Sequence, residues 1–423
     1  MNRAICWLMF LSAVIALNRR AECQEPSALE SYIRLHYAKQ EHMVPMRDGV
    51  KLFTSIYIPR DRSRTYPLLM KRTPYAVGPY GVDKYAASLG PSELLVKAGY
   101  IFVNQDVRGR FLSEGEFQQV TPHNPRKQKP TDVDESSDTF DTIEWLLKNV
   151  EGHNGRVGMY GISYPGFYAA AGMIDAHPAL IAVSPQAPVA DWYFDDFLHN
   201  GAFFLAHAFR WLGNNASPRP KPTSEKPPSV NYASPDGYKL FLEAGSMESI
   251  SRKYLKDGTP FWNEMMQHPN RDEFWQKRAL PPHLKNVAPA VMVVTGWYDA
   301  EDLYGSFKCY QAIEAQNPSV NNTLVVGPWH HGGWASPDGD RLGQISFGSK
   351  TSAFYRSEIE LPFFERHLKE VQNNPLAEAT LFETGSNVWR SFEKWPPKDM
   401  KSRKLFLQEG GLLDFKPPSG VSA

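Results

Sequence analysis

Val157-Gly158-Met159-Tyr160-Gly161-Ile162-Ser163-Tyr164-Pro165-Gly166 joins a short apolar run to a glycine-rich turn around a serine. The apolar run predicts a buried strand, and the residues after the serine predict a helix start, because proline is tolerated in a first helical turn. Gly161 and Gly166 leave room where strand and helix cross closely. Such a turn projects a serine hydroxyl above a sheet. Ser163 is therefore the candidate nucleophile of an α/β-hydrolase fold.

The turn departs from the strict pattern Gly-x-Ser-x-Gly. Pro165 stands where the second glycine is expected, and Gly166 follows it. Glycine-rich turns around a serine also occur in purely structural loops, so the motif needs support from the rest of the chain. In α/β-hydrolases an acid and then a histidine follow the serine, each after a later strand.

Two later apolar runs end in residues that can complete this triad. Gly296-Trp297-Tyr298-Asp299 follows the first run, and Gly327-Pro328-Trp329-His330-His331 follows the second. Asp299 would hold the imidazole in the right tautomer, although it also fits a helix N-cap, and the two roles are compatible. The residues alone do not say which histidine is the base. A metal site at the histidine pair is disfavoured, because no carboxylate stands at ligand spacing.

Short apolar runs alternate with helical stretches over much of the chain, which predicts a mostly parallel sheet with helices on both faces. The runs are 67–70, 100–105, 157–160, 290–295 and 323–326. Two further patterns support this fold. Residues 46–58 predict a hairpin turned at Asp48-Gly49, and residues 138–150 predict a crossover helix.

The pattern divides the chain into a core with one insertion. We predict the first part of the hydrolase core at 28–196, a helical cap at 197–285 and the second part of the core at 286–374. The aromatic cluster at 197–211 either packs the cap or lines a substrate pocket. Residues 375–423 show strand patterns without a helix. Because two or three strands cannot form a domain, we expect them to begin a β domain whose remainder is absent from the sequence.

The composition and the N-terminus restrict the partners and the location. Lys plus Arg and Asp plus Glu number 46 each, so no overall field would hold a nucleic acid or an anionic membrane, and a small-molecule partner is favoured. Residues 1–23 have the pattern of a signal peptide, with cleavage after Ala16 or Cys23; the alternative is a short buried helix. We expect a secreted or periplasmic protein with no membrane contact in its mature form. A homo-oligomer is compatible with the sequence.

The motifs taken together resemble the cocaine esterase-like and X-prolyl dipeptidyl-peptidase group of serine hydrolases, over roughly residues 43–410. The shared segments are Met46-Arg47-Asp48-Gly49, Arg72-Thr73-Pro74-Tyr75, Asp106-Val107-Arg108-Gly109-Arg110, Ser113-Glu114-Gly115, the serine turn, and the segments that end in Asp299 and His331. The resemblance selects His331 as the base. It implies that the Tyr75 hydroxyl and the Tyr164 backbone N–H stabilise the oxyanion. It also implies a C-terminal jelly-roll domain.

Within this group the sequence looks most similar to the α-amino-acid ester hydrolases, in which three acids bind the substrate's ammonium group. The matching positions are Asp196, Glu301 and Asp302. Clustered carboxylates are costly without a cation, so such a cluster predicts a positively charged ligand. Glu301 and Asp302 also fit the first turn of a helix, where acids are favoured whatever the function.

The sequence therefore predicts two-step acyl transfer. Ser163, deprotonated by His331, attacks an ester or amide carbonyl, and water then releases the acyl group; neither a metal nor an organic cofactor is needed. The predicted substrate carries an α-amino group. The alternatives are a general carboxylesterase, an acylase or an X-prolyl dipeptidyl-peptidase of the same group. A non-catalytic binding protein on this scaffold is disfavoured by the intact triad.

Overall fold

The computed structural model describes residues 26–418 except 228, 233 and 257–258. The predicted signal peptide at 1–23 lies outside these residues, so export remains a prediction. Within the described residues no helix is long and apolar enough to cross a membrane.

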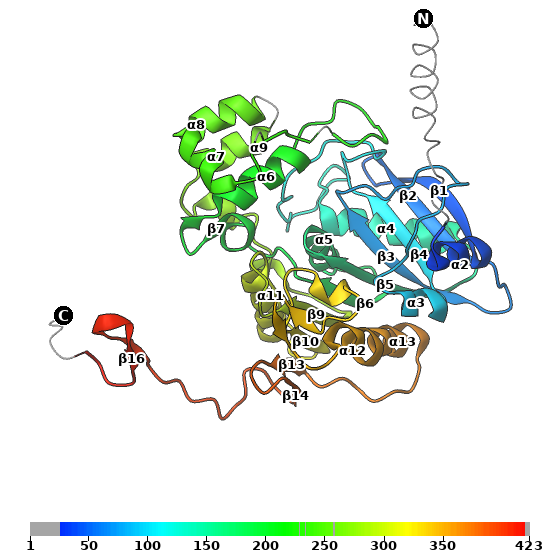
Figure 1. Ribbon diagram of the computed structural model, residues 1–423. Helices are drawn as coiled ribbons and strands as arrows, with labels where there is room; N and C mark the ends of the chain where they lie inside the picture. Colours follow the sequence, from blue (N-terminus) through cyan, green and yellow to red (C-terminus); the bar gives the residue numbers. More distant parts are fainter. Residues whose placement is uncertain (1–25, 228, 233, 257–258, 419–423) are drawn as a thin grey trace, which may run out of the picture.

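A ten-stranded sheet forms the centre of the structure (Figure 1). All neighbouring strands from β4 to β13 are parallel, whereas β1, β2 and β14 pair antiparallel at the two ends. In spatial order the strands are β1 (Tyr37–Pro45), β2 (Lys51–Pro59), β4 (Ile101–Asp106), β3 (Tyr66–Thr73), β5 (His153–Ile162), β6 (Leu180–Gln186), β9 (Ala290–Gly296), β10 (Asn322–Gly327), β13 (Ala379–Glu383) and β14 (Val388–Phe392). The predicted α/β-hydrolase fold is confirmed.

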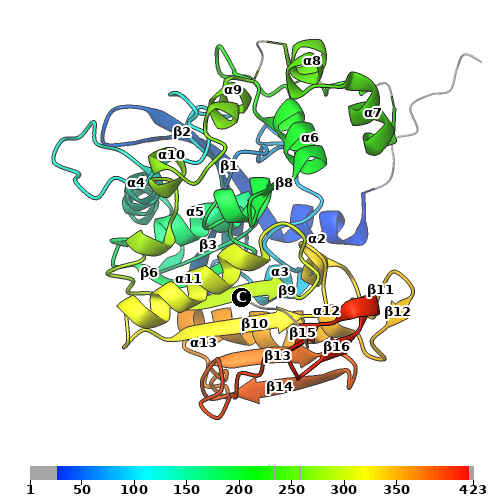
Figure 2. The ribbon, with the colours of Figure 1, turned by 90° about the vertical axis from the view of Figure 1, so that its left-hand side faces the viewer.

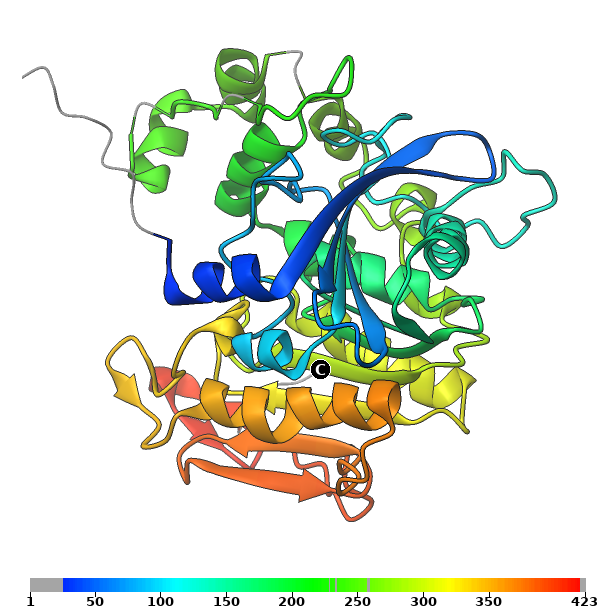
Figure 3. The same cartoon turned by 90° about the vertical axis from the view of Figure 1, so that its right-hand side faces the viewer.

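Helices cover both faces of the sheet, and an apolar core lies between the sheet and each helical layer. One face carries α4 (Glu135–Asn149), α5 (Tyr164–Gly172) and α11 (Leu303–Gln316), seen in Figure 2. The other carries α2 (Ala28–His36), α3 (Glu93–Ala98), α12 (Thr351–Phe354) and α13 (Leu361–Lys369), seen in Figure 3. Strands buried on both sides read as continuous apolar runs, which is why the sequence revealed them.

The insertion between β6 and β9 is mostly helical and lies beside the sheet in Figure 1. It begins with a π-helical turn, η1 (Tyr193–Phe197), and a small hairpin formed by β7 (Leu198–His199) and β8 (Ala202–Phe203). The helices that follow are α6 (Leu205–Asn215), α7 (Gly237–Ala244), α8 (Met247–Ile250), α9 (Pro260–Gln267) and α10 (Glu273–Gln276).

Two features of the sheet differ from the sequence prediction. Strand β6 is not evident in the sequence, because its second half, Ser184-Pro185-Gln186, consists of polar residues and proline. Ser184 can be buried there because its hydroxyl donates a hydrogen bond to the Met292 carbonyl at 3.0 Å. The sequence places residues 375–423 in a separate β domain, but β13 and β14, of which only β13 was predicted as a strand, extend the hydrolase sheet. The buried residues of β13 pair in parallel with β10, which would otherwise be a sheet edge.

Only a short ladder follows these two strands in the described residues. It consists of β15 (Phe406–Leu407) and β16 (Leu413–Asp414). Their apolar side chains Leu407 and Leu413, and Leu412 just before β16, are largely exposed. The predicted jelly roll is not tested by this segment.

The turn from β5 into α5 is the most constrained part of the fold. Ser163 has φ 97° and ψ −119°, a backbone conformation that L-residues rarely adopt. A Cβ at Gly161 would lie 2.2 Å from the Pro165 carbonyl oxygen, and one at Gly166 would lie 2.6 Å from the Gln186 carbonyl oxygen. Strand and helix therefore pack as closely as the serine turn of the sequence predicts.

This contact yields a stability prediction. Gly161→Ala should lower the free energy of unfolding by about 2 to 3 kcal/mol, because the new methyl group overlaps backbone that cannot move away. Urea unfolding followed by tryptophan fluorescence measures the change. Gly237→Ala is the control, since its Cβ would have no neighbour closer than 4.0 Å. Equal stability of the two variants would contradict the predicted overlap.

Candidate active site

The three triad candidates stand at the carboxyl ends of three parallel strands of the sheet, β5, β9 and β10. Ser163 follows β5, the Asp299 turn follows β9, and the His331 loop follows β10. The carboxyl ends of parallel strands meet at one edge of the sheet, which is where open α/β sheets bind ligands. The strand order therefore gathers residues that are far apart in the chain.

Asp299 and His331 are in direct contact. His331 Nδ1 lies 2.9 Å and 3.1 Å from the two Asp299 carboxylate oxygens. One of these oxygens also accepts the backbone N–H groups of Glu301 and Asp302, at 2.8 Å and 3.0 Å. The carboxylate thus fixes the proton on Nδ1 and leaves Nε2 as the basic nitrogen.

The same contacts set the charges of the pair. Burial raises the pKa of Asp299, but the hydrogen bond and charge of His331 and the two backbone N–H groups outweigh it, so the pKa lies below its ordinary value. Burial lowers the pKa of His331, and the Asp299 carboxylate with Glu301 more than reverses this, so its pKa lies above 6.5. The positively charged form of His331 is therefore stabilised.

Ser163 is not hydrogen-bonded to His331 in the structure. Its Oγ lies 3.5 Å from an Asp302 carboxylate oxygen, and His331 Nε2 lies 3.5 Å from a Glu301 oxygen. Hydrogen bonds of catalytic groups are often long without substrate and tighten in the complex. The three triad candidates are gathered at one site, with the Asp–His contact formed and the Ser–His contact open.

Tyr164 directly follows Ser163 in the turn, and the Tyr75 ring packs against its ring. Their ring centroids are 6.3 Å apart. The Trp211 Nε1–H on α6 donates to the Tyr75 hydroxyl at 3.1 Å, and because indole can only donate, the hydroxyl proton of Tyr75 is available for another acceptor. The Tyr164 N–H belongs to the first turn of α5, whose N–H groups have no partner within the helix. Both groups can therefore donate to an oxyanion.

The acids Asp196, Glu301 and Asp302 come together beside the triad. Oxygens of Asp196 and Glu301 lie within 4.8 Å of each other, and so do those of Glu301 and Asp302. Glu301 and Asp302 precede α11 and do not lie in its first turn, because the Asp299 carboxylate takes their N–H groups and the helix begins at Leu303. Their placement before α11 leaves both side chains near His331.

Two residues of this region were missed by the sequence analysis. His207 on α6 lies 3.2 Å from an Asp196 oxygen through its Nε2. Nothing in the sequence marks it, since a lone histidine among aromatic residues has no motif. Asp195 is fully buried and accepts the N–H groups of Ala190, Asp191 and Gly305, so it ties η1 to α11.

Two sets of donors in the described residues are close enough to share a metal ion, Asp196–His207–Glu301 and Glu301–Asp302–His331. The sequence analysis found no carboxylate at ligand spacing from the histidine pair, but the fold brings Glu301 and Asp302 to His331. Each set contains members of the triad or of the acid cluster.

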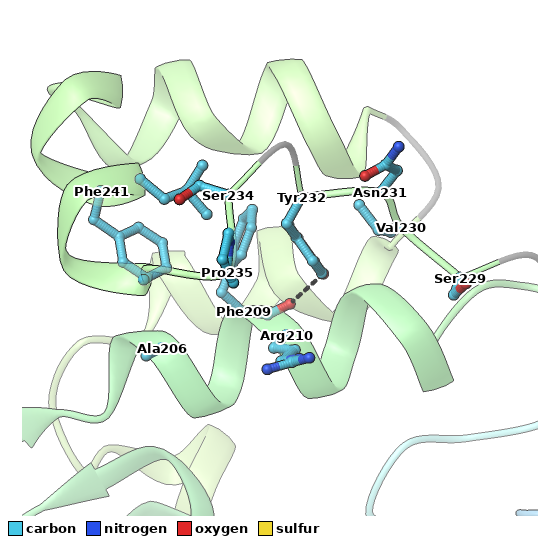
Figure 4. A pocket seen from close by; sticks show the side chains of 12 residues that line it. Ala206, Phe209, Arg210, Ser229, Val230, Asn231, Tyr232, Ser234, Pro235 and Phe241 are labelled. Atoms are coloured by element: carbon cyan, nitrogen blue, oxygen red, sulfur yellow. Dashed lines mark hydrogen bonds between the residues drawn. The ribbon is translucent and has the colours of Figure 1, made fainter.

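A cavity of about 550 Å³ lies within the cap, between α6 and α7, and no triad residue lines it (Figure 4). Phe209 and Arg210 border it from α6, and the Tyr232 hydroxyl donates to the Phe209 carbonyl at 3.4 Å. His207 and Trp211 of the same helix contact the active-site residues instead. Helix α6 thus connects the cap core with the site. A different cavity of about 550 Å³ borders Asp299 and Glu301.

Residues 48–333 match the X-Pro dipeptidyl-peptidase family, S15. Cocaine esterase of Rhodococcus sp. (strain MB1 Bresler) is 28% identical over 395 residues, which cover 90% of this chain and 64% of that protein.

Two solved structures share the fold closely. An aminopeptidase from a marine sediment Thaumarchaeota archaeon has a TM-score of 0.81 and 34% identity, covering 92% of this chain and 63% of that chain. An α-amino acid ester hydrolase has a TM-score of 0.82 and 33% identity, covering 92% and 64%. The chain thus spans a little under two thirds of the length of these relatives.

The fold and the arrangement of Ser163, Asp299 and His331 are those of the serine hydrolases with an α/β-hydrolase core. Within that class the chain belongs to the X-Pro dipeptidyl-peptidase family S15.

The nucleophile assignment is tested by Ser163→Ala. The variant should lose p-nitrophenyl acetate turnover by at least about 10⁴-fold, because it removes the hydroxyl that would attack the carbonyl carbon. Its unfolding curve should be unchanged, because alanine keeps the backbone and loses only one oxygen. Ser349→Ala, at an exposed position, is the matched control. Retained activity in Ser163→Ala would rule out this serine.

The raised pKa of His331 predicts the pH dependence. The base must be neutral, so kcat/KM for p-nitrophenyl acetate should fall as the pH drops through a midpoint above 6.5. Glu301→Gln should move this midpoint to lower pH, because the carboxylate 3.5 Å from Nε2 stabilises the imidazolium. Stopped-flow rates from pH 5 to 9 measure both. Glu225→Gln, at an exposed position, should not move it; an unmoved midpoint in Glu301→Gln would refute the coupling.

Proposed function

We propose that this protein hydrolyses esters or amides through an acyl-enzyme and prefers substrates with a free α-amino group. The observation that carries the preference is the Asp302 carboxyl, which is fully buried and has one oxygen, Oδ1, without a hydrogen-bond partner. Burying a carboxylate oxygen without a hydrogen bond lowers the stability of the protein. Its presence beside Ser163 therefore favours a ligand that supplies a hydrogen-bond donor and a positive charge.

The charges around Asp302 support the same proposal. Burial, followed by the charges of Asp196 and Asp195, raises its pKa well above the ordinary range. Within the described residues the ion-pair partners of the three cluster acids are histidines, with neither Lys nor Arg among them. A substrate ammonium placed here would stabilise the ionised acids, and its three N–H donors match the number of carboxyl groups.

The chemistry follows from the positions of the triad. Ser163 Oγ bonds to the carbonyl carbon while its proton passes to His331 Nε2, and the oxyanion takes hydrogen bonds from Tyr75 and the Tyr164 N–H. The imidazolium then gives this proton to the leaving alcohol or amine as the bond to the carbonyl carbon breaks. In the second half, water attacks the acyl-enzyme with the same base, and Ser163 is regenerated.

The names of the relatives support a substrate with a free amino group, but they do not decide whether the bond cleaved is an ester or an amide. The two solved structures with 33% and 34% identity carry the names α-amino acid ester hydrolase and aminopeptidase. The cocaine esterase, at 28% identity, is named for an ester without reference to an amino acid. A general carboxylesterase is therefore the competing function, and it would not need the three acids.

Asp196→Asn separates these functions. It should raise KM for phenylglycine methyl ester about 10- to 100-fold, because it removes a charge-assisted contact worth about 1.5 to 3 kcal/mol. Hydrolysis of the N-acetylated ester and of p-nitrophenyl acetate should change less than about twofold. Steady-state kinetics on the three substrates give the comparison.

Asp399→Asn, at an exposed position, serves as the control and should leave all three rates unchanged. Wild-type enzyme that hydrolyses the free and acetylated esters equally well would instead be a general esterase. In that case the acids have a structural role only.

A further inference from the structure

The Asp196 carboxylate has its two oxygens in different situations. Oδ1 accepts the Nε2–H of His207 at 3.2 Å. Oδ2 receives no hydrogen bond from the described residues, although Asp196 as a whole is only 6% exposed. One oxygen is therefore held by the protein, and the other remains available to a ligand.

His207 is itself held in a fixed orientation. Its ring stacks on Phe204, with centroids 5.0 Å apart and planes 13° apart, and its side chain is 17% exposed. It stands in the first turn of α6, whose Trp211, four residues later, donates to Tyr75. Residues four apart share one face of a helix, so α6 presents both contacts to the active site from one face.

We propose that His207 is a positioning residue for amine specificity, which holds Oδ1 of Asp196 so that Oδ2 faces the substrate's ammonium group. This inference rests on the proposed function, since it concerns the same ammonium site. Without the imidazole, the Asp196 carboxylate can rotate about its last torsion, which has broad minima, and the alignment of Oδ2 is lost. The substrate class that depends on His207 is therefore α-amino esters and amides, and amine-blocked acyl substrates do not depend on it.

The charges of the neighbourhood support this role. Burial lowers the pKa of His207, but the hydrogen bond and charge of Asp196, and then the charge of Glu301, raise it above its ordinary value despite an opposing contribution from His331. The contact between His207 and Asp196 is thus supported by charge as well as by the hydrogen bond.

Two variants of similar size separate hydrogen bonding from packing. His207→Phe keeps an aromatic ring against Phe204 but cannot donate to Asp196. His207→Gln keeps an N–H donor that can reach the carboxylate. His207→Phe should raise KM for phenylglycine methyl ester about tenfold with less than a twofold change in kcat, as expected when a contact made equally in ground and transition states is lost. His207→Gln should restore KM to within about threefold of the wild type.

The N-acetylated ester and p-nitrophenyl acetate should be hydrolysed at wild-type rates by both variants. A double-mutant cycle that combines His207→Phe with Asp196→Asn measures whether the two residues act together on KM, which a packing role of His207 would not produce. Once Asp196 is neutral, His207→Phe should have no further effect on KM for the free-amine ester.

Each result decides a specific point. Equal losses on all three substrates, or additive effects with Asp196→Asn, would assign His207 a purely structural role and overturn the inference. A preference for the free amine that depends on Asp196 but survives His207→Phe would also overturn it, while leaving the proposed function in place. A wild-type enzyme without amine preference would remove the proposed function itself.

Discussion

Helix α5 crosses strand β5 so closely that a side chain at position 161 has no space, and the active-site geometry depends on this contact. The backbone can turn from strand to helix within one residue only if that residue adopts positive φ, and Ser163 does so at 97°. Such strain is tolerated where the surrounding structure enforces it. Here the sheet on one side and the buried α5 on the other hold the serine above the sheet edge, with the first N–H of α5 beside it.

A second constraint is the concentration of acids around that serine. Asp195, Asp196, Asp299, Glu301 and Asp302 gather in a region where the ion-pairing side chains are histidines. The structure deals with each acid differently. Asp195 accepts hydrogen bonds from backbone N–H groups. Asp299 is paired with His331 and accepts two backbone N–H groups. His207 donates to one oxygen of Asp196. Asp302 keeps one oxygen without a hydrogen-bond partner, and its other oxygen lies 3.5 Å from Ser163 Oγ.

Core and insertion contribute different functions to this site. The strand ends supply Ser163, Asp299 and His331, and the proposed acyl transfer needs such a rigid scaffold because it depends on positions within fractions of an ångström. The segment after β6 and helix α6 supply Asp196, His207 and Trp211. His207 contacts Asp196 and Trp211 contacts Tyr75, so the insertion reaches both the acid cluster and the residues beside Ser163.

The sequence by itself determined the hydrolase fold, the serine turn and the order of serine, acid and histidine, because buried parallel strands are continuous apolar runs and a tight turn requires glycine locally. It did not reveal strand β6, whose polar half is satisfied by a neighbouring strand, or the pairing of β13 with the sheet. It proposed the three acids through a resemblance but gave no sign of His207. That histidine meets Asp196 only because η1 and α6 pack together, and a contact between segments with no shared period or motif is decided by the tertiary structure alone.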